Sequence, residues 1–251
     1  MITLSIVSHG QAALVATLLD DIARVASPHV TAIVVTHNVD ESSPTWPESL
    51  ASHIVTIANA SPRGFGANHN AAFKRSATPY FVAMNPDLRL VADPFDKLVA
   101  RFESCAADEA RIGAVAPCIV AADGTPEDSA RCLITPIDLI RRRIGGAGRA
   151  PSKNPQWLAG MFILVSSAAF RAVGGFDERY FMYCEDFDLC ARLRLNGWRF
   201  EVVESAIVVH AAQRASHRSL RHLTWHVASL LKMWSSPTFW RYRRLLIAER
   251  Q

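Results

Sequence analysis

Two short acidic motifs contain the side chains best suited to chemistry. Asn85-Pro86-Asp87 follows a β-prone apolar run, and Glu185-Asp186-Phe187-Asp188 opens a helical pattern that ends at Asn196-Gly197. Carboxylates bind divalent cations through oxygen, and a positioned carboxylate also acts as a general base. Together the two motifs indicate a metal-bound substrate that faces a carboxylate base.

The elements around these motifs place them where ligands bind. Asp87 comes directly after residues 80–84, which read as a buried strand, and open α/β sheets bind ligands at the carboxyl ends of their strands. Glu185 and Asp186 fall in the first turn of a helix, where the helix dipole favours negative charge. Each motif also has a structural interpretation, because Asn-Pro-Asp is a good turn sequence and acids at a helix start need no catalytic reason.

Strand and helix signals alternate along the first half of the chain. This alternation predicts a nucleotide-binding βαβ half. Strands are expected at 2–8, 31–36, 53–58, 80–84, 112–115, 162–165, 200–203 and 207–209, and helices at 14–25, 66–75, 95–102 and 167–173. The basic, glycine-rich stretch 141–151 breaks the pattern and is predicted to be a mobile loop.

Composition sets the class of protein. The 251 residues can form one α/β domain with a small appendage, and no apolar run approaches membrane-spanning length. No basic region precedes the first strand, so we expect a cytoplasmic protein, either soluble or peripheral at the inner face of the plasma membrane, with no nucleic-acid partner. Five cysteines without a Cys-x-x-Cys pair favour reduced structural thiols over a disulfide framework or a zinc site.

Positive charge is concentrated at the C-terminal end. From residue 211 onward eight basic residues face one acid, so this segment carries +7 and the rest −3 of the formal net charge of +4. Apolar residues within it repeat at helical spacing: Leu220, Leu223, Val227, Leu230, Leu231 and Trp234. A basic amphipathic helix suits an anionic membrane surface. A helix that caps the main domain or forms a homodimer is an equal alternative.

An ordered series of motifs gives the chain its resemblance to a known family. The series comprises the first strand 4–8, Asn59, 64–70, 85–87, 157–160, 174–178, 185–189, Arg192, Gly197-Trp198 and His210. Across residues 2–215 it resembles family 2 inverting glycosyltransferases of the GT-A fold, in the bacterial branch that includes rhamnosyltransferases. The resemblance implies an α/β, Rossmann-like mixed central sheet flanked by helices, followed by a basic amphipathic helical extension. It divides the chain into a GT-A domain, 1–215, with a nucleotide-binding half, 1–90, an acceptor-binding half, 91–215, and an extension, 216–251.

The resemblance also implies a metal site and a base. Asp87 matches the last acid of the family's metal motif, while Asn85 replaces the first acid. One carboxylate and the imidazole of His210 would then bind Mg²⁺ or Mn²⁺, with the remaining ligands from the substrate diphosphate and water. Asp186 would be the general base, and Glu185 would orient it or contact the acceptor.

Further residues are assigned to the two substrates in the same way. Trp157, Ala159 and Gly160 would bind the acceptor. The nucleotide candidates are Ser5, Ser8, Asn38, Asn59, Asn70 and Asp87. The acid that ends the second strand in many relatives is replaced by His37, which leaves the donor open. The Gly64-Phe65-Gly66 segment does not fit a dinucleotide-binding motif, because His69 stands at its third glycine position.

Two functions of different classes follow. The first is an inverting transferase that moves a sugar, rhamnose or another deoxyhexose, from a nucleoside-diphosphate donor to a glycan or lipid-linked acceptor in surface polysaccharide synthesis. The second is a catalytically silent GT-A-like module that binds nucleotide or glycan as a scaffold. A nucleotidyltransferase is a weaker third option, because Ser8-His9-Gly10-Gln11 lacks the basic residues of a phosphate loop.

Overall fold

A mixed β-sheet forms the centre of the molecule in the computed structural model, which describes residues 1–104, 111–136, 155–211 and 220–249. Cys105 and the loop predicted at 141–151 lie outside these ranges. The strand order among the described residues is β3-β2-β1-β4-β9-β6-β10-β5. The strands are β1 Ile2–Ser8, β2 Val30–His37, β3 Ile54–Ala58, β4 Tyr80–Met84, β5 Leu88–Arg89, β6 Ile112–Ala121, β9 Phe162–Ser166 and β10 Arg199–His210.

The sheet changes character at β9. Strands β3, β2, β1 and β4 are parallel, as the predicted βαβ half requires. Strand β9 is antiparallel to both β4 and β6, and β5 is antiparallel to β10. A separate antiparallel pair joins β7, Ala130–Arg131, to β8, Trp157–Leu158. The sheet is therefore mixed, as the family resemblance implied.

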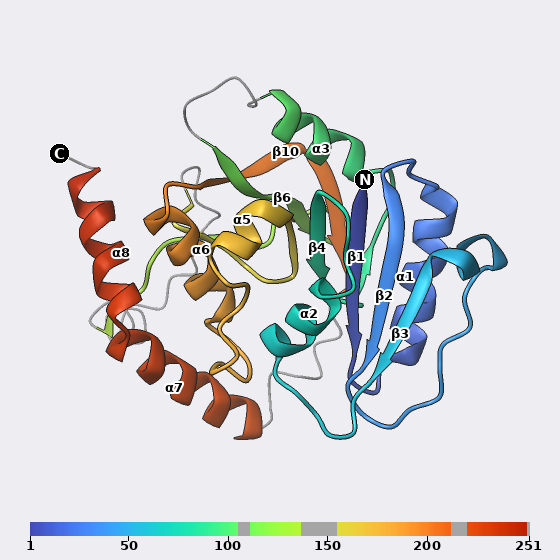
Figure 1. The fold of residues 1–251 in the computed structure, drawn as a ribbon, viewed down its shortest axis with the longest axis horizontal. Helices are drawn as coiled ribbons and strands as arrows, with labels where there is room; N and C mark the ends of the chain where they lie inside the picture. Colours follow the sequence, from blue (N-terminus) through green and yellow to red (C-terminus); the bar gives the residue numbers. More distant parts are fainter. Residues whose placement is uncertain (105–110, 137–154, 212–219, 250–251) are drawn as a thin grey trace.

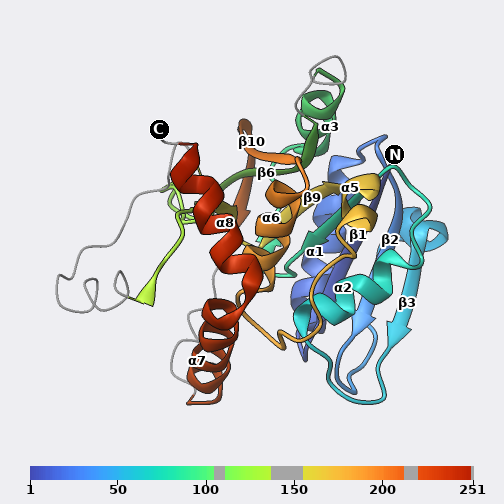
Figure 2. The ribbon, with the colours of Figure 1, turned by 60° about the vertical axis from the view of Figure 1, so that its left-hand side comes forward.

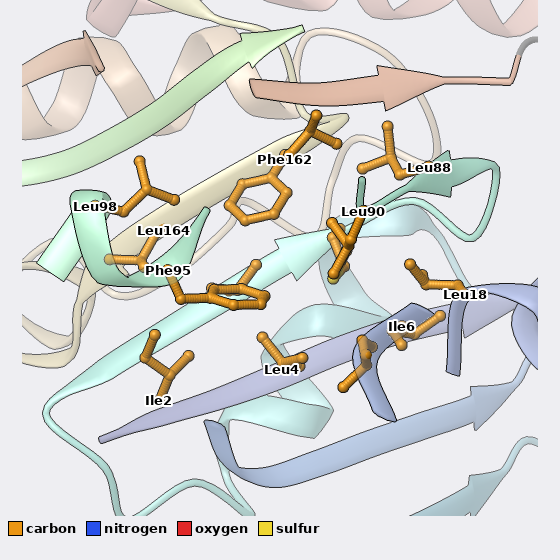
Figure 3. Packing of buried hydrophobic residues seen from close by; sticks show 14 of the residues in the cluster. Ile2, Leu4, Ile6, Leu18, Leu88, Leu90, Phe95, Leu98, Phe162 and Leu164 are labelled. Carbon is orange, nitrogen blue, oxygen red and sulfur yellow. The ribbon is translucent and has the colours of Figure 1, made fainter. Parts of the chain in front are cut away.

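Helices cover both faces of the sheet (Figure 1). One face packs against α1, Ala12–Val25, and α3, Phe95–Ser104, through a core that includes Leu4, Leu18 and Phe95 (Figure 3). The other face packs against α2, Phe65–Phe73, α5, Ser167–Ala172, and α6, Glu185–Leu195. Successive residues of β4 enter opposite cores, because side chains alternate along a strand.

Several boundaries differ from the sequence predictions. A 3₁₀ helix, Glu48–His53, takes the residue expected to open the third strand, and β6 continues well past 115. The two late strands are one strand, β10, because the register on β6 steps from Val203 opposite Pro117 to Ile207 opposite Cys118. The three residues between Val203 and Ile207 form an irregularity that a local pattern reads as a gap.

The C-terminal extension forms two helices, α7, Leu220–Ser235, and α8, Pro237–Ala248. Ser236 caps α8 by accepting a hydrogen bond from the amide of Phe239. The extension buries Met233, Phe239 and Tyr242 against Phe187 of α6, so it packs on the main domain (Figure 2). No helix in the described ranges is long and apolar enough to cross a membrane.

Candidate active site

Asp87 and His210 meet at one end of the sheet. Asp87 lies in the turn between β4 and β5, and His210 is the last residue of β10. The pairing of His210 with Leu88, and a hydrogen bond from the amide of Ala211 to the Asp87 carbonyl, hold the two strand ends together. The Asp87 Oδ2 atom lies 3.2 Å from His210 Nε2. Two residues far apart in sequence thus bring together one oxygen and one nitrogen atom that could bind a metal ion.

This pair fits a divalent cation. The Oδ1 atom of Asp87 is buried and has no hydrogen-bond partner among the described residues. The other ring nitrogen of His210, Nδ1, lies 2.7 Å from Glu127 Oε2, the arrangement in which a carboxylate orients a metal-binding imidazole. No group of three or more His, Cys, Asp or Glu side chains in the described ranges could hold a metal ion. The remaining ligands would come from substrate and water.

The two carboxylates also control the charge of His210. Hydrogen bonds that the ring donates to Asp87 and to Glu127 raise the pKa of His210 to about 9, against the opposing effect of burial. The ring is therefore protonated at neutral pH without a metal, and a metal ion must displace that proton.

Asp186 is a buried carboxylate in the first turn of α6. Its Oδ2 accepts a hydrogen bond of 2.9 Å from the amide of Gly160, and its Oδ1 accepts one of 2.8 Å from the amide of Phe187. Burial raises the pKa of both Asp186 and Glu185, and the Asp186 charge raises that of Glu185 further. Arg131 and the backbone amides oppose the rise at Asp186. The hydrogen bonds and Arg131 thus favour the charged form of Asp186, and that charge favours the protonated form of Glu185.

One short segment connects the two acidic motifs. The carbonyl of Met161 accepts a hydrogen bond of 2.9 Å from the amide of Asn85, two residues before Asp87. The neighbouring residue, Gly160, donates to Asp186. Residues 160–161 thus connect the turn that holds Asp87 to the base candidate Asp186.

Comparison with known proteins finds relatives in sequence and in fold. No protein-family model matches the chain. It is 33% identical over 188 residues to N-acetylglucosaminyl-diphospho-decaprenol L-rhamnosyltransferase of Mycobacterium tuberculosis, covering 65% of this chain and 60% of that protein. Rhamnosyltransferase WbbL of Escherichia coli is 44% identical over 78 residues, or 30% of this chain and 29% of that protein.

A solved structure has the same fold. The mannosyltransferase PcManGT of Pyrobaculum calidifontis, in complex with GDP-Man and Mn²⁺, superposes with a TM-score of 0.58 at 17% identity, covering 92% of this chain and 64% of that one. The chain is related to family 2 rhamnosyltransferase-like glycosyltransferases. Its fold is GT-A, as expected from the motifs. The chain spans about 60% of the length of its mycobacterial relative, so activity and substrates are inferred below.

Two residues beside the site were not identified from the sequence, Glu127 and Arg131. Glu127 contacts His210, and the guanidinium of Arg131 lies 5.0 Å from the centre of the Trp157 ring. Between them, the Ser129 carbonyl accepts a hydrogen bond from the amide of Ala159. The sequence of residues 123–126 gives a local signal for a turn before this segment. It gives no signal for the residues that Glu127 and Arg131 contact.

The acceptor candidates differ in burial and in their partners. Trp157 is half-buried and donates its indole N–H to the Cys132 carbonyl at 3.3 Å. Ala159 is buried, and Gly160 uses its amide to hold Asp186. A Cβ on Gly160 would lie 3.5 Å from the Asp186 Cβ, so a small residue fits here.

Two nucleotide candidates, Ser5 and Ser8, have partners within the protein. Ser5 is fully buried in β1, and its hydroxyl lies 2.8 Å from His69 Nδ1. Ser8 is also buried, and its hydroxyl accepts a hydrogen bond from the amide of Gln11 before α1. These contacts give both serines a structural role, and their role in nucleotide binding stays a prediction.

Asn70 also has partners within the protein. Its side-chain amide bonds to both backbone groups of Phe176, so it joins α2 to the segment before α6. Its role in nucleotide binding stays a prediction.

Gly64, in the glycine segment before Asn70, lies against another backbone. A Cβ on Gly64 would lie 2.7 Å from the Phe181 carbonyl oxygen, which accepts a hydrogen bond from the amide of Phe65. Gly64 therefore allows the two backbones to approach.

Asn38 and Asn59 lie together beyond the ends of β2 and β3. The Asn59 side chain donates to Asn38 at 2.8 Å and to Asn68 at 2.7 Å. Close by in sequence, His37 and Glu41 form a mostly buried pair, with Nδ1 and Oε1 3.5 Å apart and no hydrogen bond to either side chain within the described part of the chain. On α6, Asp188 and Arg192 stand four residues apart and form an ion pair at 2.6 Å.

Proposed function

We propose that this chain is an inverting glycosyltransferase that moves a deoxyhexose such as rhamnose from a nucleoside-diphosphate donor to a glycan or lipid-linked acceptor. The observation that carries the proposal is Asp186, a buried carboxylate held by two backbone amides beside Glu185, whose pKa is raised by burial and by the Asp186 charge. The relationship to an L-rhamnosyltransferase that acts on a lipid-linked sugar supports the substrate class.

The residues divide the reaction between them. Asp186 takes the proton of the acceptor hydroxyl while the hydroxyl oxygen bonds to the anomeric carbon of the donor. The bond from that carbon to the diphosphate breaks with its electron pair on the departing nucleoside diphosphate, so the configuration inverts. A divalent cation, Mg²⁺ or Mn²⁺, held by Asp87 and His210, would neutralise the charge of this leaving group.

The donor nucleoside fits the region beyond β2 and β3. Asn38 and Asn59 supply neutral amides there, and the buried His37 and Glu41 have hydrogen-bonding capacity that no described residue uses. Buried polar groups without partners are costly in a protein interior. A base or ribose would satisfy them, so this pair is our candidate for donor selection.

A thermal-shift screen of nucleoside diphosphates with and without Mn²⁺ tests the proposal first, because a ligand of the native state stabilises it by mass action. We expect one diphosphate to stabilise the protein more with Mn²⁺, and this extra shift to vanish in Asp87→Ala. The matching sugar donor is then assayed for transfer. Metal-linked binding without any transfer would favour the scaffold function, and equal shifts in Asp87→Ala would reject the metal site.

A further inference from the structure

The turn that enters α6 has a strained backbone. Tyr183 and Cys184 are consecutive non-glycine residues in the left-handed region, with φ of 72° and 67°. A bulky residue rarely adopts this conformation, and it persists only where surrounding contacts enforce it. Strain of this kind concentrates at functional sites. The contacts that enforce it here therefore bear on the acidic residues that follow, Glu185 and Asp186.

This turn fixes where α6 begins. Cys184 is the residue before the helix, and its carbonyl accepts a hydrogen bond of 2.9 Å from the amide of Asp188. The Cys184 side chain makes no capping hydrogen bond to the helix. Asp186 lies in the first turn, so the direction of its carboxylate depends on the backbone at 183–184. Because Cys184 does not cap the helix, contacts from elsewhere must hold its start.

Helix α7 supplies those contacts. The Tyr183 hydroxyl lies 2.8 Å from His222 Nδ1, so one hydrogen bond joins them whichever atom donates. The ring centres of Tyr183 and His226 lie 5.0 Å apart in an edge-to-face arrangement. One turn further, the Ser229 hydroxyl donates to the Met182 carbonyl at 2.8 Å. Residues 222, 226 and 229 share one helix face, so α7 lies along the turn that leads into α6 (Figure 1).

The two halves of α7 pack on different parts of the molecule. The C-terminal half enters the core shared with α6 and α8 through Met233, which is buried. The N-terminal half contacts the strained segment: the ring centres of Trp225 and Phe181 lie 4.9 Å apart, next to the hydrogen bond of Tyr183 with His222. This half of α7 therefore packs on residues 181–183 and bears on the start of α6.

We propose that helix α7 positions the base, because the hydrogen bond between Tyr183 and His222 holds the strained turn from which Asp186 extends. The inference rests on the proposed function and adds Tyr183 and His222 as positioning residues. The amide of Gly160 holds the Asp186 carboxylate at 2.9 Å, and the turn sets the backbone behind it. Without the hydrogen bond the turn relaxes and the carboxylate shifts. Proton transfer requires hydrogen-bond reach, so even a small shift of the base lowers the rate.

Kinetics of variants at this hydrogen bond test the inference. Tyr183→Phe keeps the ring and removes the hydroxyl, so we expect kcat to fall about tenfold with the KM of donor and acceptor unchanged. His222→Ala should cause the same loss, and the double variant should be no slower, because both changes remove one hydrogen bond. His222→Asn places an amide near the position of Nδ1 and should restore most of the rate. Tyr80→Phe, in β4, and Leu223→Ala, on the exposed face of α7, are matched controls that should keep the parent's kcat.

An NMR measurement separates this inference from the proposed function. The amide proton of Gly160 donates to Asp186 Oδ2, so its signal reports the position of the carboxylate without any transfer. In Tyr183→Phe we expect this signal to shift, while that of Gly113 in β6 stays in place. The same shift in a protein that shows no transfer would reject the glycosyltransferase and keep the positioning role. An unmoved Gly160 signal, or a shifted signal with the kcat of the parent, would overturn the inference.

Discussion

At the scale of single residues, Asp186 and Glu185 show how different surroundings act on two adjacent carboxyls. Both are buried, but only Asp186 accepts hydrogen bonds from Gly160 and Phe187 and lies in the field of Arg131. These interactions favour the charged form of Asp186, and its charge then favours the protonated form of Glu185. The opposite tendencies of the two carboxyls to ionise therefore follow from backbone geometry and from the nearby charge of Arg131.

The first prediction concerns the base. Asp186→Asn preserves shape but removes the proton acceptor, so kcat should fall by about 10²-fold or more with the donor KM unchanged. Steady-state kinetics with saturating acceptor provide the measurement, and Asp20→Asn on the exposed side of α1 is the control. Near-normal turnover in Asp186→Asn would exclude this role.

The second prediction concerns stability against pH. The pKa of Glu185 is raised above its value of about 4.3 in an unfolded chain, so its contribution to stability is full below that pH and is lost as pH rises through the folded-state pKa. Glu185→Gln removes this titration. Urea unfolding from pH 5 to 8 should show a smaller loss of the free energy of unfolding in Glu185→Gln, while the exposed Glu48→Gln should follow the parent.

The third prediction concerns the metal site. Glu127→Gln removes the carboxylate that orients His210 through Nδ1, and loss of such a partner typically weakens metal affinity about 10- to 100-fold. Titration of Mn²⁺ by electron paramagnetic resonance, in the presence of a nucleoside diphosphate, measures this affinity directly. The exposed Glu204→Gln should bind Mn²⁺ as the parent does, and equal affinity in Glu127→Gln would contradict the orienting role.

At the scale of elements, the sequence predicted the alternating strands and helices and the strand ends at which Asp87 and His210 lie. It did not show the partners that Ser5, Ser8 and Asn70 have within the protein, because a polar residue near a strand end can face the core as well as a ligand. It also missed Glu127 and Arg131. These residues contact His210 and Trp157, which lie far along the chain, and no local periodicity encodes such contacts.

The fourth prediction concerns the packing of α2 against the segment before α6. A methyl group at Gly64 would approach the Phe181 carbonyl oxygen to 2.7 Å, and backbone cannot move aside as a flexible side chain can. Gly64→Ala should therefore lower the free energy of unfolding by about 1–3 kcal/mol, measured by chemical denaturation. A stability equal to that of the parent would show that the segment shifts freely.

At the scale of the whole molecule, the C-terminal extension combines two properties. Its inner side packs on α6 through Phe239 and Tyr242, which supports the predicted cap. Its outer side exposes Leu223, Val227 and Leu231 on α7 and, on α8, Trp240 beside Arg243. The extension can therefore stabilise the domain and still present a basic, apolar surface, so the two sequence interpretations do not exclude each other.

The fifth prediction concerns that surface. Replacing Arg241, Arg243 and Arg244 by Gln should reduce sedimentation with anionic liposomes, and its salt dependence should weaken, because the Debye length falls from about 10 Å at 0.1 M to about 3 Å at 1 M. Transfer to a short water-soluble acceptor should persist. Replacing Lys74, Arg75 and Arg171 by Gln removes the same charge elsewhere and is the control. If the parent protein does not bind anionic liposomes at low salt, only the role of the extension as a cap on the main domain remains.

The hydrogen bond from the Phe65 amide to the Phe181 carbonyl joins the half proposed to bind the donor to the segment that leads into Asp186 and contacts α7. Any shift of α2 on donor binding is therefore transmitted to the position of the acceptor groups. By thermodynamic reciprocity, an acceptor that fixes this segment must change the affinity for the donor by the same factor as the donor changes the affinity for the acceptor. The two substrates would then bind cooperatively, and the order in which they add would follow from which of them fixes the segment first.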